Sequence, residues 1–177
     1  MNYAQMRKYD SSNGSGIGAT IFLSGCKHNC PGCFNSLYFD EDYGTLLDDK
    51  AIDTFIGYLK NPHVNHSAIL GGEPLLMPTG PEDLEHFLKR VKEEVPEKAM
   101  WMWTGYTLND LQVSSDYLDK IRLRLINDYV DYLVDGKYVK ALYSNRIIFR
   151  GSTNQIIWKK NESGIFEECK ELNNFRL

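Results

Sequence analysis

The chain has 177 residues, of which 42% are hydrophobic, 25% are charged and 12% are aromatic, and its formal net charge is −4. This length suits one domain whose core buries enough surface to fold without disulfides. The acidic balance argues against a nucleic-acid-binding protein, and no segment approaches the roughly 20 apolar residues of a membrane span.

Residues 1–16 contain no apolar core between a basic start and a cleavage site, so no secretory leader is predicted. The expected location is therefore the cytoplasm. Thiols stay reduced there, and clustered cysteines bind metal or do chemistry more often than they form disulfides.

The pattern of apolar residues predicts four strands and three helices that alternate along most of the chain. A strand over 19–25 is followed by a helix over 48–60 with an Asp as its cap, a strand over 67–74, a helix over 80–95 and a strand over 99–106. A helix over 114–129, capped by Ser114 or Ser115, and a strand over 129–136 complete this part. After it, short β-like runs over 145–151, 154–160 and 164–169 have no helices between them.

Strands that alternate with helices predict an α/β fold with a mainly parallel sheet and right-handed crossovers. Ligands of such sheets lie outside the carboxyl ends of the strands. Here those ends read SGCKHNCPGC, GGEP, TGY and DGKY. Thiol, acid, hydroxyl and glycine groups are therefore expected on one rim of the sheet, where we place the chemistry.

Three of the four cysteines, Cys26, Cys30 and Cys33, lie in one loop with the spacing C-x-x-x-C-x-x-C. On a compact loop all three sulfurs can surround one object, whereas a disulfide would leave one of them over. A closed zinc site needs a fourth ligand, and His28 is badly placed for that between two of the cysteines. Cys169 is either a distant fourth ligand or, as we favour, a small hydrophobe. The remaining interpretation is a [4Fe–4S] cluster with three thiolates and one open iron.

The cysteine spacing after the first strand, followed by GGEP after the second, resembles the radical S-adenosylmethionine (SAM) superfamily. The ordered set NGSG, GCKHNCPGCFN, GGEPLL, WMWTGY, VDGKY and RGSTNQ resembles the activating proteins of anaerobic (class III) ribonucleoside-triphosphate reductases, over about residues 13–155. The resemblance implies a partial (β/α) barrel of radical SAM type. Residues 1–177 would be a single activase domain, with 156–177 as a short β-rich C-terminal extension.

The resemblance also implies the site and its chemistry. Cys26, Cys30 and Cys33 would hold the [4Fe–4S] cluster, and SAM would chelate the open iron. The SAM pocket would be lined by Gly32, Cys33, Phe34, Gly71, Gly72 and Glu73. An electron from a flavodoxin-like donor would cleave SAM to a 5′-deoxyadenosyl radical, which takes a hydrogen atom from a glycine of the reductase.

Three positions depart from the pattern that the resemblance implies. Gly32 stands where many superfamily members have an aromatic residue near the adenine, so Phe34 or another apolar group is expected to take that place. Ser15 replaces a proline in NGSG, and Glu73 replaces an aspartate. None of the three is an implied cluster ligand.

Two rival functions remain open: activation of another glycyl radical enzyme, such as pyruvate formate-lyase, and a non-catalytic zinc-binding interaction module. WTGY and RGSTNQ argue against the first. VDGKY and RGSTNQ are candidate segments for docking the reductase or supporting the site, with turns and edge strands as the alternative. His63 and His66 are expected in a polar loop, and Trp101 and Trp103 as packing on both faces of a strand.

Overall fold

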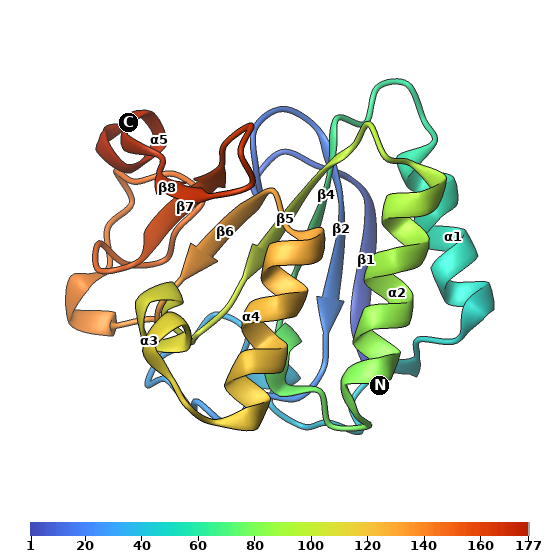
Figure 1. The fold of residues 1–177 in the computed structure, drawn as a ribbon, viewed down its shortest axis with the longest axis horizontal. Helices are drawn as coiled ribbons and strands as arrows, with labels where there is room; N and C mark the ends of the chain where they lie inside the picture. Colours follow the sequence, from blue (N-terminus) through green and yellow to red (C-terminus); the bar gives the residue numbers. More distant parts are fainter. Residues whose placement is uncertain (177) are drawn as a thin grey trace.

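The computed structural model describes residues 1–176 and contains one mixed sheet in the strand order β3-β1-β2-β4-β5-β6-β7-β8 (Figure 1). The strands are β1 Asn2–Asp10, β2 Gly18–Leu23, β3 Thr45–Leu46, β4 His66–Gly71, β5 Ala99–Trp103, β6 Tyr132–Asp135, β7 Ile156–Lys160 and β8 Phe166–Glu168. The helices are α1 Asp49–Leu59, α2 Pro81–Glu94, α3 Leu108–Val113, α4 Tyr117–Tyr129 and α5 Lys170–Asn174. Short 3-10 turns lie at Ser36–Tyr38, Pro74–Leu76 and Lys140–Leu142.

The four strands at the centre of the sheet, β2, β4, β5 and β6, pair in parallel, as predicted. The flanking strands β1, β3, β7 and β8 all pair antiparallel. The sheet is therefore mixed, and the prediction of a mainly parallel sheet is wrong outside its centre. Short connections explain two of the antiparallel pairs, β1–β2 and β7–β8, because a parallel crossover needs a dozen or more residues and usually a helix. The connection from β6 to β7 is longer but contains no α-helix that could cross over the sheet.

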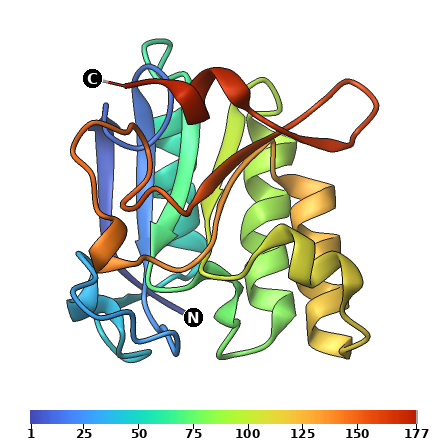
Figure 2. The same ribbon diagram turned by 90° about the vertical axis from the view of Figure 1, so that its left-hand side faces the viewer.

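Helices α1, α2 and α4 cover one face of the sheet (Figures 1 and 2). Their apolar stripes and the alternate residues of the central strands form the larger core, in which Phe55 of α1 and Phe87 of α2 are fully buried. The predicted Asp cap of α1 is confirmed, since the Asp48 side chain accepts from Ala51 N. At α4 the predicted serine cap is wrong, because Asp116 caps this helix. Its side-chain carboxylate accepts hydrogen bonds from Leu118 N and Asp119 N, two and three residues further along the chain.

The opposite face of the sheet carries a smaller apolar cluster, covered by chain from residues 140–155 and the C-terminal part (Figure 2). Trp101 is 1% exposed there and stacks on Tyr132 with ring centroids 4.2 Å apart. Trp103 lies on the same face, because residues two apart on a strand point the same way. The expectation that the two tryptophans pack on both faces is therefore wrong.

Several elements differ from the sequence-based expectation. Strand β1 was not predicted, because its half-exposed, mixed polar and apolar residues show no clear alternation and an antiparallel neighbour stabilises it. Residues 145–151 form no strand. Within them Phe149 has a left-handed backbone (φ 57°) and its carbonyl accepts from Trp103 Nε1 at 2.7 Å. His66 is buried in β4 rather than placed in a polar loop, and its Nε2 contacts the Asn13 carbonyl at 2.7 Å.

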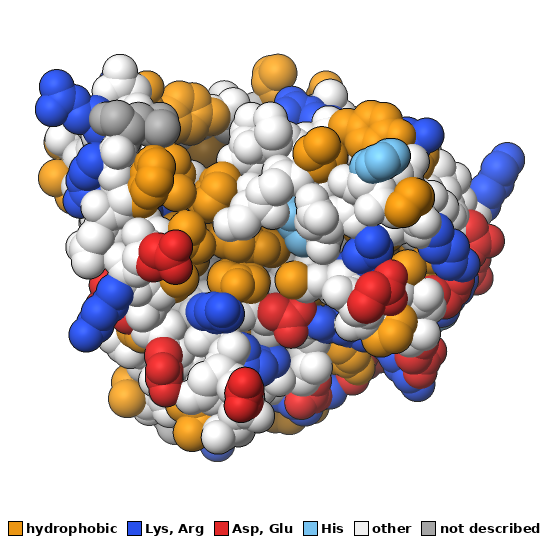
Figure 3. All heavy atoms as spheres, turned by 90° about the horizontal axis from the view of Figure 1, so that it is seen from above, with side chains coloured by type: hydrophobic (Ala, Val, Ile, Leu, Met, Phe, Trp, Pro, Cys, Tyr) orange, Lys and Arg blue, Asp and Glu red, His pale blue; other side chains and the backbone are white. Residues whose placement is uncertain are grey.

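None of the helices that the structure describes has the length and apolar character that a membrane span requires. Figure 3 shows basic and acidic side chains interspersed on the face seen from above, with apolar side chains gathered near its centre.

Candidate functional site

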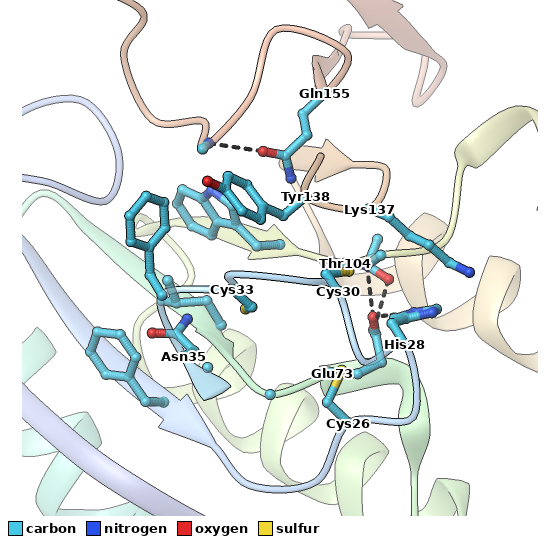
Figure 4. A pocket seen from close by; sticks show the side chains of 18 of the residues that line it. Cys26, His28, Cys30, Cys33, Asn35, Glu73, Thr104, Lys137, Tyr138 and Gln155 are labelled. Carbon is cyan, nitrogen blue, oxygen red and sulfur yellow. Dashed lines mark hydrogen bonds and ion pairs between the residues drawn. The ribbon is translucent and has the colours of Figure 1, made fainter. Parts of the chain in front are cut away.

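A cavity of about 410 Å³ lies at the carboxyl ends of the parallel strands (Figure 4). Each of the four strand ends singled out in the sequence contributes to its wall, as expected. The lining residues include Cys26, Cys30, Cys33, Gly71, Gly72, Glu73, Thr104, Gly105, Gly136, Lys137 and Tyr138. Parallel strands bring distant segments together here because their carboxyl ends all meet at one edge of the sheet.

The cysteine loop is attached at its base by main-chain hydrogen bonds. Gly25 N donates to Tyr38 O at 2.9 Å and Cys26 N to Phe39 O at 3.0 Å. A third bond, from Glu73 N to Gly25 O at 2.7 Å, joins the loop to the turn after β4. These main-chain hydrogen bonds define the position of the base of the loop.

All three loop cysteines are free and half-buried, and all three line the cavity. Burial raises the pKa of the Cys26 thiol, and the negative charge of Glu73 adds to the effect. Burial also raises the pKa of Cys33. Thiolates at this site therefore need a positive centre to stabilise them, which a metal supplies. Cys169 packs against the smaller apolar cluster and is not among the cavity-lining residues, in line with its role as a small hydrophobe.

The donor set fits a cluster better than a single ion. Among residues 1–176, no three His, Cys, Asp or Glu side chains gather closely enough to hold one metal ion. A tetrahedral zinc site needs four ligands on one atom at about 2.0–2.3 Å. Thiolates that each bind a different iron do not have to converge on one point, so three thiols spread around one cavity suit an iron–sulfur cluster.

The glycines of the GGEP turn bring the end of β4 against the cysteine loop. Gly71 has φ +114°, and a Cβ on it would lie 2.5 Å from Leu23 O. A Cβ on Gly72 would lie 2.3 Å from Gly25 O. The sequence suggested that these glycines admit a ligand; the structure shows that they also admit neighbouring main chain, which no side chain would allow.

Glu73 is 3% exposed, and its carboxylate accepts four hydrogen bonds. Oε1 accepts from Leu75 N at 3.0 Å and Thr104 Oγ1 at 2.7 Å. Oε2 accepts from Gly105 N at 2.7 Å and contacts His28 Nε2 at 2.9 Å. The acceptor sites of an ionised carboxylate, about four in number, are thus in use, and Nε2 of His28 must carry the hydrogen.

The other predicted SAM contacts lie in different surroundings. Cys33 and Phe34 line the cavity, but Phe34 is 69% exposed and packs on Tyr138 and Tyr143, with ring centroids 5.2 and 5.8 Å away. Gly32 is not among the lining residues. A Cβ on Gly32 would lie 2.9 Å from Lys140 Cδ, so a lysine side chain covers the position that the sequence left open.

VDGKY and RGSTNQ together form the wall facing the cysteine loop. Gln155 joins them: its Nε2 donates to Gly136 O at 2.9 Å, and its Oε1 accepts from Gly151 N at 2.8 Å and Ser152 N at 3.1 Å. Asn154 Nδ2 donates to Lys137 O at 2.9 Å. Both segments thus support the cavity. Neither this pairing nor the contacts of His28 and Thr104 with Glu73 could be found from the spacing in the sequence, although WTGY was noted as a motif.

Comparison with known proteins gives consistent results. Residues 12–158 match the family model of the 4Fe-4S single cluster domain. The chain is 40% identical over 159 residues to the anaerobic ribonucleoside-triphosphate reductase-activating protein of Haemophilus influenzae, covering 89% of this chain and 97% of that one. The protein of the same name from Escherichia coli K12 is 35% identical over 159 residues, which cover 89% of this chain and 97% of that one. The one from phage T4 is 32% identical over 167 residues, which cover 94% of this chain and 99% of that one.

Proposed function

The chain belongs to the family of anaerobic ribonucleoside-triphosphate reductase-activating proteins, and on that premise we propose that it is the radical SAM activase of such a reductase. The observation that carries the proposal is the set of three free thiols on one loop, at a cavity where four parallel strands end. Three thiolates leave one iron of a [4Fe–4S] cluster without a protein ligand, and an open coordination position distinguishes catalytic from structural metal sites.

In this proposal Cys26, Cys30 and Cys33 hold the cluster. Once reduced by an external donor, the bound cluster would supply the one electron for cleavage of SAM to methionine and a 5′-deoxyadenosyl radical, which would remove a hydrogen atom from a glycine of the reductase. The protein binds and orients the cofactor and the substrate, and it excludes competing reactions. The predicted SAM contacts Cys33, Phe34, Gly71, Gly72 and Glu73 line one cavity with the thiols, which supports their assignment.

The partner protein must deliver a loop to this cavity. Exposed apolar side chains lie on the cysteine loop and on residues 139–143, and they offer a docking surface. They are Phe34, Leu37, Leu142 and Tyr143, of which Leu37 is 72% exposed. Reduction by a flavodoxin-like donor and the partial (β/α) barrel stay predictions from the resemblance. A cytoplasmic location and the absence of nucleic acid among the partners stay predictions from the N-terminal sequence and the charge balance.

The test is anaerobic reconstitution with iron and sulfide, followed by addition of SAM, a reductant and a class III reductase. We expect a glycyl-radical signal in the electron paramagnetic resonance spectrum that depends on each component. A signal with a pyruvate formate-lyase type partner instead would favour the first rival function. Stoichiometric zinc without acid-labile sulfide in anaerobically purified protein would favour the second.

A further inference from the structure

His28 has a defined structural partner inside the cavity wall. It lies between Cys26 and Cys30, and its side chain is directed at Glu73 (Figure 4). The His28 side chain is 13% exposed, whereas that of its neighbour Lys27 is 76% exposed. One side chain of the cysteine loop therefore packs inward while the adjacent one faces solvent.

The WTGY segment forms a seat for the His28 ring. A Cβ on Gly105 would lie 2.3 Å from His28 Cδ2 and 2.6 Å from Nε2, so the ring fills the space that the glycine leaves. Tyr106 meets the ring edge to face, with centroids 4.8 Å apart and planes at 70°. Thr104 holds the other oxygen of Glu73 at 2.7 Å. Each residue of the TGY segment thus contacts either His28 or its hydrogen-bond partner.

The seat is itself anchored to the neighbouring strand ends. Gly136 N, after β6, donates to Tyr106 O at 2.9 Å. The Arg122 guanidinium lies over the Tyr106 ring at 4.5 Å, and Arg122 Nε donates to Leu75 O at 3.0 Å. His28 therefore ties the cysteine loop to a rigid unit built from the ends of β4, β5 and β6.

We propose that His28 is a positioning residue, which, through its hydrogen bond to Glu73 and its seat on Gly105 and Tyr106, holds the cluster-ligand loop in register with the turn that binds SAM. This rests on the proposed function, because it assigns the thiols to the cluster and the GGEP turn to SAM. A hydrogen bond to an ionised, buried carboxylate is among the stronger side-chain contacts, so its loss frees the loop. In this chain the His28 ring fills the space that the missing side chain of Gly105 leaves.

The first measurement uses the protein without its cluster. We compare the alkylation rate by iodoacetamide of the peptide carrying Cys26, Cys30 and Cys33, by mass spectrometry, in the wild type and in His28→Ala, His28→Gln and His63→Ala. His63 is an exposed histidine with no side-chain hydrogen bond among those found in residues 1–176, which makes it the matched control. We expect His28→Ala to react about tenfold faster, because the loop opens more often once one charge-assisted hydrogen bond is lost. We expect His28→Gln to stay near the wild type, since its amide N–H can still donate to Glu73.

The second measurement uses the reconstituted protein. At equal iron and sulfide content we expect His28→Ala to bind SAM about tenfold more weakly and His28→Gln to recover most of the affinity. If His28 only stabilised the fold, His28→Ala would lower the thermal stability, and His28→Gln would not restore the affinity for SAM. Wild-type values for His28→Ala in both measurements, or equal impairment of the Ala and Gln variants, would overturn the inference.

Failure of the proposed function is distinguishable from failure of this inference. If the wild type takes up no cluster, the proposed function fails, and the alkylation rates still decide whether His28 restrains the loop. If the wild type takes up a cluster and binds SAM while His28→Ala behaves identically, only the positioning role is lost. If His28→Ala alone fails to retain iron and His28→Gln retains it, the positioning role is supported.

Discussion

Substitution of Gly105 by alanine tests the packing of His28 directly. The three heavy atoms nearest to the added Cβ all belong to the His28 ring, at 2.3, 2.6 and 3.0 Å. Carbon atoms pack best at about 3.5–4.0 Å, so the methyl group and the ring cannot both keep their places. Gly105 is not among the glycines with positive φ, and the alanine backbone itself is unstrained. The ring, and with it the cysteine loop, must move.

The size of the effect follows from the cost of overpacking a contact between two half-buried residues. We expect Gly105→Ala to lower the free energy of unfolding by about 1–3 kcal/mol. In a His28→Ala background the obstructing ring is absent, and the same substitution should be neutral or stabilising by up to about 1 kcal/mol, because alanine restricts the unfolded chain more than glycine does. The difference between the two backgrounds is the coupling energy of the pair.

The assay is urea unfolding of the cluster-free protein, followed by tryptophan fluorescence, for the wild type, both single variants and the double variant. Equal slopes across the four proteins are needed for the free energies to be compared. An equal cost of Gly105→Ala with and without the His28 ring would refute the reasoning, because the clash would then lie elsewhere.

Three further predictions concern other parts of the molecule. Cys30→Ser should abolish the iron–sulfur absorbance after reconstitution, whereas Cys169→Ser, in a cysteine outside the cavity, should retain it. Gly57→Ala, on an exposed position of α1 with nothing within 4 Å of the added carbon, should raise the free energy of unfolding by about 0.5–1 kcal/mol in the same urea assay. Burial lowers the pKa of His66 below its usual 6.5, against the opposing effects of the Asn13 carbonyl and Asp10, so stability should fall as the pH drops below about 6.5.

Each of these predictions has a clear contrary result. Loss of iron in Cys169→Ser would make that cysteine a ligand. A destabilised Gly57→Ala would mean that the helix is strained at that point. For His66 the sign follows from proton binding: the folded state disfavours the charged ring, so the unfolded state binds more protons as the pH falls. Unfolding measured between pH 5 and 8 should therefore show a shallower pH dependence in His66→Gln than in the wild type, and identical slopes would contradict the assignment.

Much of the centre of the fold could be predicted from the sequence. Strands with continuous apolar runs, such as β2 and β4, are buried on both faces, and amphipathic helices such as α2 show their period over several turns. The outer strands were harder to predict from the sequence. Strand β1 has one neighbour on each side in an antiparallel arrangement and half-exposed residues, so its stability comes from pairing rather than from a local pattern.

In the candidate site, too, local features could be predicted from the sequence and contacts between distant segments could not. The cysteine spacing and the glycines of GGEP are local features, and their position after strands predicted that they would share a rim. The environment of Gly32 was not local: Lys140, distant in sequence, fills the space beside it. Phe34 likewise packs on Tyr138 and Tyr143, because the segment after β6 lies across the loop.

By itself, then, the sequence determined the donor atoms: three thiols in one short loop, an acid after two glycines, and the alternation of strands and helices that carries both to one edge of a sheet. Only the tertiary structure decided which groups touch. His28 looked like a poor metal ligand between two cysteines, and its partner Glu73 lies 45 residues away in the chain. Hydrogen bonds and packing across parallel strands depend on register and on side-chain direction, and these are defined only when the strands have paired.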